Sequence, residues 1–363
     1  MLEPDELLRL VRGALQGEDL PLREKEWEGF TACLLEQGCL ALLARLPRET
    51  PATTKAKSML AAGALAARER LRACEPVFRR LEQAGIPYAV VKGPVLSVMA
   101  YGGEGRRLSG DLDLLAAPGD VRAVGAALRE EGFCQGHWGE DGQPVPCTRE
   151  EDIFHTSYTH QTVPFLKRTA SRFFPAVNVD VNTDLFWGEH PTPCDMEAVL
   201  SHREEAVIGG VRLAKLQPAM EFIALCLHHY KDSHSLFMIA EGKMKLSLFC
   251  DLYAYPLRQR EHLPPERVLA FARRLGAAPY VAWCLEATRL LFQDARLEPL
   301  AAAFREAADP DAADRIGLEP GEYKTWPLTL PERLLGADRT AVFQGILNEK
   351  DRRKIAVNRR MMK

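Results

Sequence analysis

The chain has 363 residues, of which 47% are apolar, so it is long enough to build more than one packed unit. Its 47 Lys and Arg residues nearly balance 50 Asp and Glu residues, which excludes a global basic field for nucleic acid or anionic membrane and leaves only a local basic groove open. The nine cysteines are scattered and contain no C-x-x-C pair, which argues against a disulfide framework or a zinc knuckle.

The sequence shows neither the pattern of a signal peptide nor that of a membrane-spanning helix. The N-terminus opens acidic, without the cationic start and apolar run of a signal peptide. No stretch approaches the roughly 20 consecutive apolar residues that a membrane-spanning helix requires. We therefore expect a cytoplasmic protein without a membrane partner.

The elements predicted along the chain begin with helices and change to strands after Gly85. Apolar residues at helical spacing predict about three helices before Gly85, which is a plausible C-terminal cap. The next predicted elements are a strand at 86–92, a helix at 95–101, a glycine-rich loop at 102–105, a strand at 111–115 and a helix opening at Pro118. This alternation of strand and helix is typical of an α/β core.

The second half of the chain combines strand and helix patterns. Residues 136–175 are polar, aromatic and rich in proline, and predict a hairpin or lid-like loop. Residues 176–182 alternate valines with polar residues as a strand does, and 207–213 predict a hairpin that turns at Gly-Gly. Helical spacing resumes at Pro218, and the basic C-terminal segment is predicted to be an exposed tail.

Two carboxylates, Asp111 and Asp113, flank Leu112 in a short apolar segment. Alternate side chains of a strand share a face, so both carboxylates are predicted to project together. Adjacent carboxylates repel one another unless a cation lies between them, and Mg²⁺ is the usual hard, oxygen-seeking solution. The segment predicts a metal-dependent phosphoryl-transfer site, with a solvated edge strand as the alternative.

A second pair with the same spacing, Asp309 and Asp311, serves as a control within the chain. It lies in an Ala-, Asp- and Pro-rich stretch without apolar alternation. Spacing alone therefore does not predict a site, and the strand context of Asp111 and Asp113 carries the argument.

Residues 90–115 show a more specific pattern. The sequence Val90-Val91-Lys92-Gly93 is followed by Tyr101, Arg107 and Asp111-Leu112-Asp113-Leu114-Leu115. This pattern resembles the bacterial uncharacterised nucleotidyltransferase family of the DNA polymerase β-like superfamily, in which an apolar strand ends in Leu-Lys-Gly and Arg-x-x-x-Asp-x-Asp-Leu-Leu follows. The resemblance extends over roughly residues 5 to 290 and is strongest in this central motif.

The resemblance implies an α+β fold with a nucleotidyltransferase-like mixed β-sheet core. The predicted domains are an N-terminal helical region at 1–84, the core at 85–215 with an irregular insertion at about 136–175, a C-terminal helical domain at 216–300 and an extension at 301–363.

The resemblance also implies catalytic roles for carboxylates. Asp111 and Asp113 would bind Mg²⁺ or Mn²⁺, and Asp180 is the candidate for a third catalytic and metal-binding carboxylate on a neighbouring strand. Asp184 is the fallback, because Asn182-Thr183 stands where a His-Trp pair often follows the third acid.

Other residues are predicted to bind the substrates. The candidates for the phosphates of a nucleoside triphosphate (NTP) are Lys92, Gly93, Arg107, Ser109 and Gly110. Lys92 could instead cap a strand end, and Arg107 could pair with a surface acid. The candidates for the acceptor side are His228, Lys231 and Asp251, with polar helix surface as the alternative and without the H-E-x-x-H spacing of a metal site.

The predicted reaction moves a nucleoside monophosphate from an NTP to a hydroxyl group and releases pyrophosphate through a two-metal mechanism. The sequence leaves three classes of acceptor open: a small molecule, a peptide and a tRNA end. The near-neutral net charge disfavours a large RNA. Two alternatives stay open. One is a catalytically impaired binding or scaffold protein, and the other is transfer of the γ-phosphate on the same scaffold.

Overall fold

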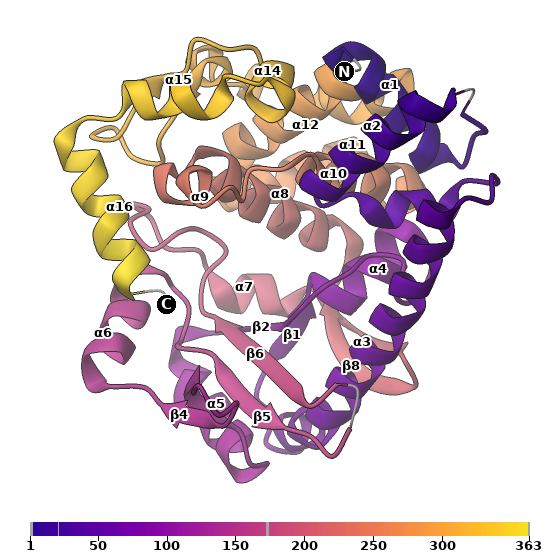
Figure 1. Ribbon diagram of the computed structural model, residues 1–363. Helices are drawn as coiled ribbons and strands as arrows, with labels where there is room; N and C mark the ends of the chain where they lie inside the picture. Colours follow the sequence, from indigo (N-terminus) through magenta and orange to yellow (C-terminus); the bar gives the residue numbers. More distant parts are fainter. Residues whose placement is uncertain (1–2, 21, 172–173, 362–363) are drawn as a thin grey trace. The chain divides into compact units, whose positions relative to one another are not determined.

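The computed structural model describes residues 3–20, 22–171 and 174–361 (Figure 1). The chain folds as two compact units, one formed by residues 61–224 and the other by residues 1–60 together with 225–363. We call them the sheet unit and the helical unit. The predicted boundaries near residues 84, 215 and 300 differ from this division, because the helices α3 (Pro51–Gln83) and α8 (Pro218–His234) each run through a boundary.

In the described part of the sheet unit, eight strands form one mixed sheet in the order β4-β3-β5-β6-β2-β1-β8-β7. The strands are β1 (Tyr88–Val91), β2 (Leu112–Ala116), β3 (Cys134–Trp138), β4 (Pro144–Pro146), β5 (Phe165–Arg168), β6 (Ala176–Asn182), β7 (Arg203–Ile208) and β8 (Val211–Leu216). Its helices besides α3 are α4 (Gly93–Tyr101), the short η2 (Pro118–Asp120), α5 (Val121–Glu130), α6 (Arg149–Tyr158) and α7 (Met196–Ser201). A mixed sheet with flanking helices confirms the predicted α+β class.

One face of the central strands forms the core of the sheet unit. Strand β6 alternates three buried valines with three partly exposed polar residues, Asn178, Asp180 and Asn182. The valines join Leu112 and Leu114 of β2 in an apolar cluster with residues of α3 and α5. Each such buried side chain contributes about 1.5–3 kcal/mol to folding, so the register of these strands is strongly fixed. The opposite face is left for the polar residues of β6.

The stretch predicted to be a hairpin or a lid-like loop, residues 136–175, extends the sheet, and its first part is a hairpin of the antiparallel strands β3 and β4. It contains the end of β3, then β4, α6 and β5, and β5 pairs with β6. Strand β3 is partly exposed and has no apolar alternation, so backbone pairing defines it and its sequence pattern does not. At Gly136 an added Cβ would lie 1.8 Å from the Val145 carbonyl oxygen, which explains the glycine at this close strand contact.

The predicted hairpin at 207–213 is confirmed. Strands β7 and β8 pair directly from Ile208 to Val211. The turn residues Gly209 and Gly210 have φ angles of 62° and 79°, the left-handed conformation that a two-residue hairpin turn needs at both central positions.

The helical unit contains the first and the last parts of the chain. Its elements are α1 (Pro4–Gln16), α2 (Glu24–Glu36), η1 (Leu40–Arg45), most of α8, α9 (Leu236–Ala240), α10 (Leu246–Arg258), η3 (Arg260–His262), α11 (Pro265–Arg274), α12 (Ala278–Phe292), η4 (Ala295–Leu297), α13 (Glu298–Phe304), η5 (Arg305–Ala307), η6 (Pro310–Ala313), β9 (Arg315–Ile316), β10 (Lys324–Thr325), α14 (Leu330–Leu335), α15 (Arg339–Ile346) and α16 (Glu349–Met361). Among the described helices, none combines the length and the apolar character that crossing a membrane takes.

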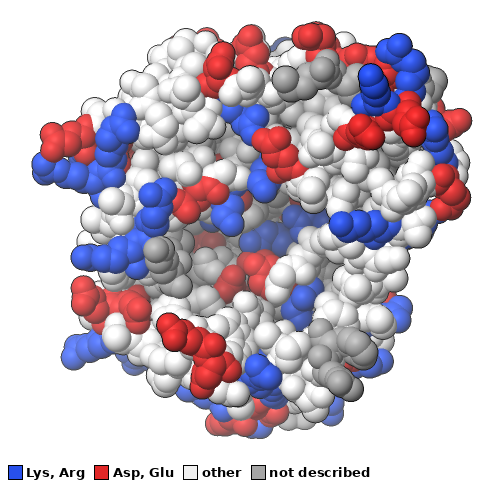
Figure 2. Space-filling model, in the orientation of Figure 1, with Lys and Arg blue, Asp and Glu red and all other residues white. Residues whose placement is uncertain are grey.

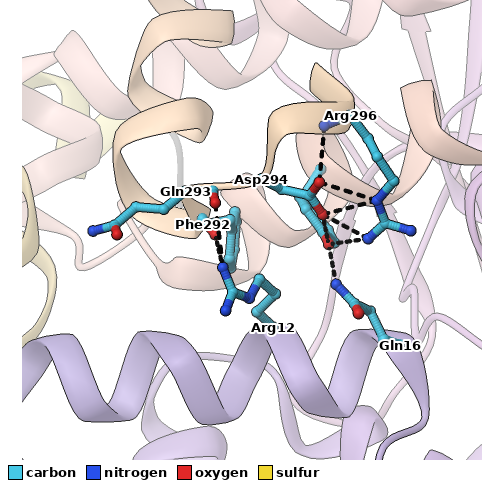
Figure 3. A network of polar contacts seen from close by, with 7 residues as sticks. Arg12, Gln16, Phe292, Gln293, Asp294 and Arg296 are labelled. Atoms are coloured by element: carbon cyan, nitrogen blue, oxygen red, sulfur yellow. Dashed lines mark hydrogen bonds and ion pairs between the residues drawn. The ribbon is translucent and has the colours of Figure 1, made fainter. Parts of the chain in front are cut away.

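Polar contacts join the N-terminal and C-terminal segments inside this unit (Figure 3). Arg12 of α1 donates hydrogen bonds to the carbonyl oxygens of Phe292 (2.8 Å) and Gln293 (3.3 Å) at the end of α12. The last carbonyl groups of a helix have no partner within the helix, so Arg12 satisfies two of them. The Gln16 side-chain amide is hydrogen bonded to the Tyr253 hydroxyl at 2.7 Å. These contacts explain why residues 1–60 belong with the C-terminal helices.

The basic C-terminal segment is a packed helix and not a tail, although most of its arginines are exposed as predicted. Ile355 of α16 is buried in an apolar cluster with Trp326 and Phe343. Arg359 forms an ion pair with Glu241 at 2.6 Å. The sequence pattern is dominated by charge, and it conceals the few apolar residues that anchor α16.

Candidate functional site

Strand pairing brings two of the predicted acids together on the sheet. Strands β2 and β6 are parallel neighbours, and Asp113 lies directly opposite Asp180. On its other side β2 pairs with β1, and Asp113 lies opposite Val91, the residue before Lys92. Figure 1 shows these three strands side by side. Residues from three distant segments therefore meet at one place.

Asp111 belongs to the same cluster but not to the strand. Strand β2 begins at Leu112, so Asp111 is the last residue of the preceding loop, and the predicted strand at 111–115 starts one residue too early. Burial raises the pKa of Asp180, and the charges of Asp113 and Asp111 raise it further. We call Asp111, Asp113 and Asp180 the carboxylate cluster.

Lys92 supplies the cation at this cluster. Its Nζ lies 2.7 Å from Oδ1 of Asp113, a residue that is only 5% exposed. A buried carboxylate needs a partner, because an uncompensated charge in a protein interior is strongly destabilising. Asn182 of β6 donates a second, longer hydrogen bond of 3.3 Å to the same oxygen.

The backbone at Lys92 is strained. Its φ of 54° lies in the left-handed region, which costs a non-glycine residue about 1–3 kcal/mol. Lys92 stands between β1 and α4, and its carbonyl oxygen accepts the Leu96 N–H at 2.9 Å as the helix begins. Strain of this kind persists only where the surrounding structure enforces it, and it clusters at functional sites.

Burial and the charges of neighbouring acids shift Asp111 and Asp180 toward their neutral forms. Burial, followed by the charge of Asp113, raises the pKa of Asp111. Burial, followed by the charges of Asp113 and Asp111, raises the pKa of Asp180 to about 7. The charge of Lys92 opposes both shifts. A further cation would favour the ionised forms in the same way.

The donor set suits Mg²⁺ or Mn²⁺, because three carboxylates supply the oxygen ligands that hard cations prefer. In the described ranges of the chain, no group of three His, Cys, Asp or Glu residues stands ready to hold a metal ion. Asp113 is instead engaged by Lys92. Metal binding by this cluster stays a prediction.

The predicted phosphate-binding residues lie in the turn after β1 and in the loop that leads into Asp111. Gly93 has a φ of 39°, and an added Cβ would lie 3.4 Å from the Asp111 carbonyl oxygen, so the two backbone segments approach closely. The backbone N–H of Arg107 donates to the Ser97 hydroxyl at 3.1 Å. Gly110 is exposed beside the partly exposed Ser109. The structure thus places these residues near one another, and their binding of phosphate stays a prediction.

Helix α3, in which the sequence revealed no chemistry, contributes Arg70 to the loop that leads into Asp111. Arg70 is 7% exposed, and its Nη2 donates to the carbonyl oxygen of Ser109 at 2.8 Å and to its hydroxyl at 3.2 Å. Burial lowers the Arg70 pKa, and the charge of Asp111 opposes this shift. The available sequence signal is that Arg70 falls on the apolar face of α3, next to the buried Leu71 and Cys74.

The same helix packs tightly against the glycine-rich loop. An added Cβ at Gly105 would lie 2.4 Å from the Ala64 Cβ, and Gly105 has a φ of 67°. Arg68 of α3 forms an ion pair with Glu104 at 2.6 Å. The loop that leads into Asp111 is therefore held at both ends by α3.

Asp184, the fallback for the third acid, has a structural role instead. Its Oδ1 accepts the Phe186 N–H at 2.8 Å, and its Oδ2 accepts the Cys194 N–H at 2.9 Å. These bonds fix the loop after β6. Asp180 alone lies opposite Asp113 in the strand register, so it is the better candidate.

The predicted acceptor-side residues belong to the helical unit. Asp251 of α10 is 1% exposed, and its Oδ2 lies 3.2 Å from Nε2 of His229. His228 and Lys231 lie near Asp232, at 3.4 Å and 4.0 Å. The burial of Asp251 and its contact with His229 are typical of a structural pair, while acceptor contacts by His228 and Lys231 stay predictions.

Comparison with known families places the carboxylate cluster inside a matched segment. A family model described as an uncharacterised nucleotidyltransferase matches residues 23–293, about three quarters of the chain. The match includes the whole sheet unit. Searches of curated proteins and of solved structures gave no match.

Proposed function

Because the chain belongs to the uncharacterised nucleotidyltransferase family, we propose that it moves a nucleoside monophosphate from an NTP to a hydroxyl group and releases pyrophosphate. The observation that carries this proposal is the register of β2 and β6, with Asp113 opposite Asp180 and Lys92 beside them. Nucleotidyl transfer requires charge compensation at the phosphates and a group that accepts the hydroxyl proton. The carboxylate cluster and its neighbours offer both.

The acids have separate roles in this proposal. Asp111 and Asp113 would hold Mg²⁺ or Mn²⁺, which when bound polarises the phosphate oxygens. Asp180 would bind the metal ion on the acceptor side and receive the hydroxyl proton. Burial and the charges of Asp113 and Asp111 raise its pKa to about 7 in the metal-free site, and a bound cation would lower it, so Asp180 would be ionised and able to accept a proton near neutral pH.

Basic residues and backbone groups would orient the triphosphate. Lys92 offers a compact charge on a flexible stem, and Arg107 offers a planar fork that matches phosphate geometry. Backbone N–H groups near Gly93, Ser109 and Gly110 would complete the cradle. These groups would act on the phosphates of any nucleotide, so they do not select a base.

The charge distribution favours a small acceptor. Figure 2 shows Lys and Arg intermixed with Asp and Glu over the visible face, in keeping with the overall balance of 47 to 50. A protein that contacts many phosphates of a large RNA normally carries a basic excess. A small molecule or a peptide therefore suits the chain better than a tRNA end, and His228 and Lys231 remain candidates for its contacts.

The position of a radiolabel tests the proposal. The purified chain would be incubated with Mg²⁺, with each NTP carrying ³²P at the α or the γ position, and with a panel of hydroxylated small molecules, serine- and tyrosine-containing peptides and total tRNA. Transfer of the α-label with release of pyrophosphate is the expected result. Transfer of the γ-label would replace nucleotidyl transfer by phosphotransfer.

A second candidate function is nucleotide binding without transfer. It is favoured by the engagement of Asp113 with both Lys92 and Asn182, and by Asn182-Thr183 at the place of the expected His-Trp pair. Calorimetry with Mg²⁺ and each NTP would separate the two functions. Binding of nucleotide with no pyrophosphate release in the presence of any acceptor would establish the second one.

A further inference from the structure

Lys92 is the one cation whose influence on all members of the carboxylate cluster is visible in the described residues. Its ammonium contacts Asp113 directly, and its charge acts on both Asp111 and Asp180. Arg107 acts on Asp111. A divalent ion at this cluster would have to share the same oxygens with the ammonium of Lys92.

We propose that Lys92 is an internal counter-ion that a divalent metal must displace from Asp113, and that the polyphosphate of the nucleotide holds Lys92 once it has left. Metal and nucleotide then bind cooperatively, and each alone binds weakly. This inference rests on the proposed function, since it assigns the binding order of the same site.

The burial of Asp113 explains why one cation must replace the other. Asp113 is 5% exposed, so water cannot solvate its charge if Lys92 leaves without a replacement. Asn182 donates to the same oxygen from 3.3 Å, but it carries no charge to compensate the carboxylate. Displacement by a metal ion is therefore the route that keeps Asp113 compensated.

The geometry of Lys92 permits the exchange. The backbone is fixed, because the Lys92 carbonyl oxygen accepts the Leu96 N–H at the start of α4 and its φ is held at 54°. The side chain is a flexible four-carbon stem with a compact charge, so it can turn without moving the backbone. Once displaced, the ammonium is a solvated cation beside a metal ion, and a polyphosphate is the anion that would compensate both.

Because the affinities for metal and nucleotide are linked, the inference predicts the direction in which each affinity changes. If nucleotide strengthens metal binding by a given factor, metal strengthens nucleotide binding by the same factor. Removing Lys92 should raise the affinity for metal in the absence of nucleotide, whereas removing a residue that merely supports the site should lower it. Coupling of this kind typically amounts to about 5–150-fold.

The test measures Mn²⁺ binding to the full chain by electron paramagnetic resonance, with and without the α,β-methylene analogue of each NTP. In the unmodified chain, the analogue should raise Mn²⁺ affinity about tenfold. In Lys92→Met, Mn²⁺ should bind about tenfold more tightly without nucleotide, and the analogue should add little. Asp113→Asn supplies the background from other Mn²⁺ sites.

Two matched variants control for charge and for folding. Lys92→Arg keeps a cation at the position and should keep the weak Mn²⁺ binding of the unmodified chain. Lys167→Met removes one positive charge from β5 of the same sheet, where the ammonium donates to the Glu131 carbonyl oxygen at 2.6 Å, and should leave Mn²⁺ affinity unchanged.

Two results would overturn the inference. One is a folded Lys92→Met chain that binds Mn²⁺ no more tightly than the unmodified chain. The other is Mn²⁺ binding by the unmodified chain that does not depend on the nucleotide analogue, and this measurement decides the matter if Lys92→Met does not fold. A failure of the proposed function looks different, because α-label transfer would then be absent while the Mn²⁺ measurements could still show the exchange.

Discussion

Two Asp-x-Asp segments of this chain share a spacing and differ in their surroundings. At Asp111 and Asp113, burial and then the neighbouring carboxylate raise the pKa of Asp111. At Asp309, burial also acts to raise the pKa, but the N–H of Asp311 and the guanidinium of Arg315 outweigh it and leave the pKa below its usual value. The spacing is the same, and the electrostatic outcome is opposite.

The two segments differ in whether neighbouring groups compensate the charge of the carboxylates, and this difference distinguishes a candidate site from a structural turn. Asp309 has donors of its own: its Oδ1 accepts the Asp311 N–H at 3.0 Å, and Arg315 pairs with its other oxygen. Its charge is satisfied locally. The three acids of the carboxylate cluster depend largely on Lys92, and the excess of negative charge that remains is what a metal and a nucleotide would relieve.

The largest effect should come from removing one charge of the cluster. Asp111→Asn and Asp113→Asn should each lower α-label transfer by about 10³-fold, because each loses a metal-binding carboxylate at little cost in shape. Transfer rates at saturating NTP and circular dichroism would measure activity and fold. Asp311→Asn is the matched control and should change the rate less than about twofold. Full activity in both cluster variants would contradict the metal-binding role of Asp111 and Asp113.

The next effect is a pH dependence governed by Asp180. Burial and the charges of Asp113 and Asp111 raise the Asp180 pKa to about 7 in the metal-free site, and a bound cation lowers it, so transfer should rise as the pH increases toward 7 and Asp180 becomes ionised. Asp180→Asn should lower the rate by about 10²-fold and abolish this rise. An unchanged profile in Asp180→Asn would assign the proton transfer to another group.

The same pKa predicts a stability effect with a definite sign. A carboxyl group in the unfolded chain has a pKa of about 3.9, so the folded state binds the Asp180 proton more tightly. Its contribution to stability is therefore complete below about pH 4 and is lost as the pH rises through about 7. Thermal unfolding from pH 5 to 8 should show this loss in the unmodified chain and not in Asp180→Asn, and added Mg²⁺ should offset it.

Much of the sheet unit could be predicted from the sequence. The alternation in 176–182 predicted β6 and the polar side of Asp180, because the valines have a two-residue period that only one register can bury. The strand and helix around Lys92 were confirmed for the same reason. Which strands pair could not be predicted, and the meeting of Asp113 with Asp180 depends on pairing between residues 67 positions apart.

Elements without a regular spacing of apolar residues, and contacts between distant residues, could not be predicted from the sequence. Strand β3 has no apolar alternation, and α16 is held by a few apolar residues among many charges, so composition indicated a hairpin or a loop for the first and a tail for the second. The ion pair of Lys92 with Asp113 and the contact of Arg70 with Ser109 are long-range contacts that no local pattern contains. The family match covers residues 23–293 and does not test these contacts.

A smaller effect should follow from Arg70, which tests how firmly the loop before Asp111 must be held. Arg70→Met should keep the apolar packing of α3 and lose the hydrogen bonds to Ser109, and charged hydrogen bonds contribute about 1.5–3 kcal/mol. We expect a lower free energy of unfolding by roughly that amount, measured with urea, and a weaker apparent affinity for Mn²⁺. Arg72→Met, which removes an exposed arginine of the same helix paired with Glu69, is the control and should change both by little. A loss of stability with unchanged Mn²⁺ affinity would limit Arg70 to the fold.

The smallest effect should come from Asp309, which tests whether the second Asp-x-Asp segment contributes to stability alone. Asp309→Ala removes the acceptor for the Asp311 N–H and the partner of Arg315, so we expect a loss of about 1 kcal/mol in the free energy of unfolding and no change in α-label transfer. Asp309→Asn keeps an acceptor and should lose less. Because the folded-state pKa of Asp309 is lowered, its contribution is present above the unfolded pKa of about 3.9 and is lost as the pH falls below it, opposite to Asp180. If Asp309→Ala reduced transfer as strongly as Asp113→Asn, local satisfaction of charge would no longer distinguish the structural pair from the functional one.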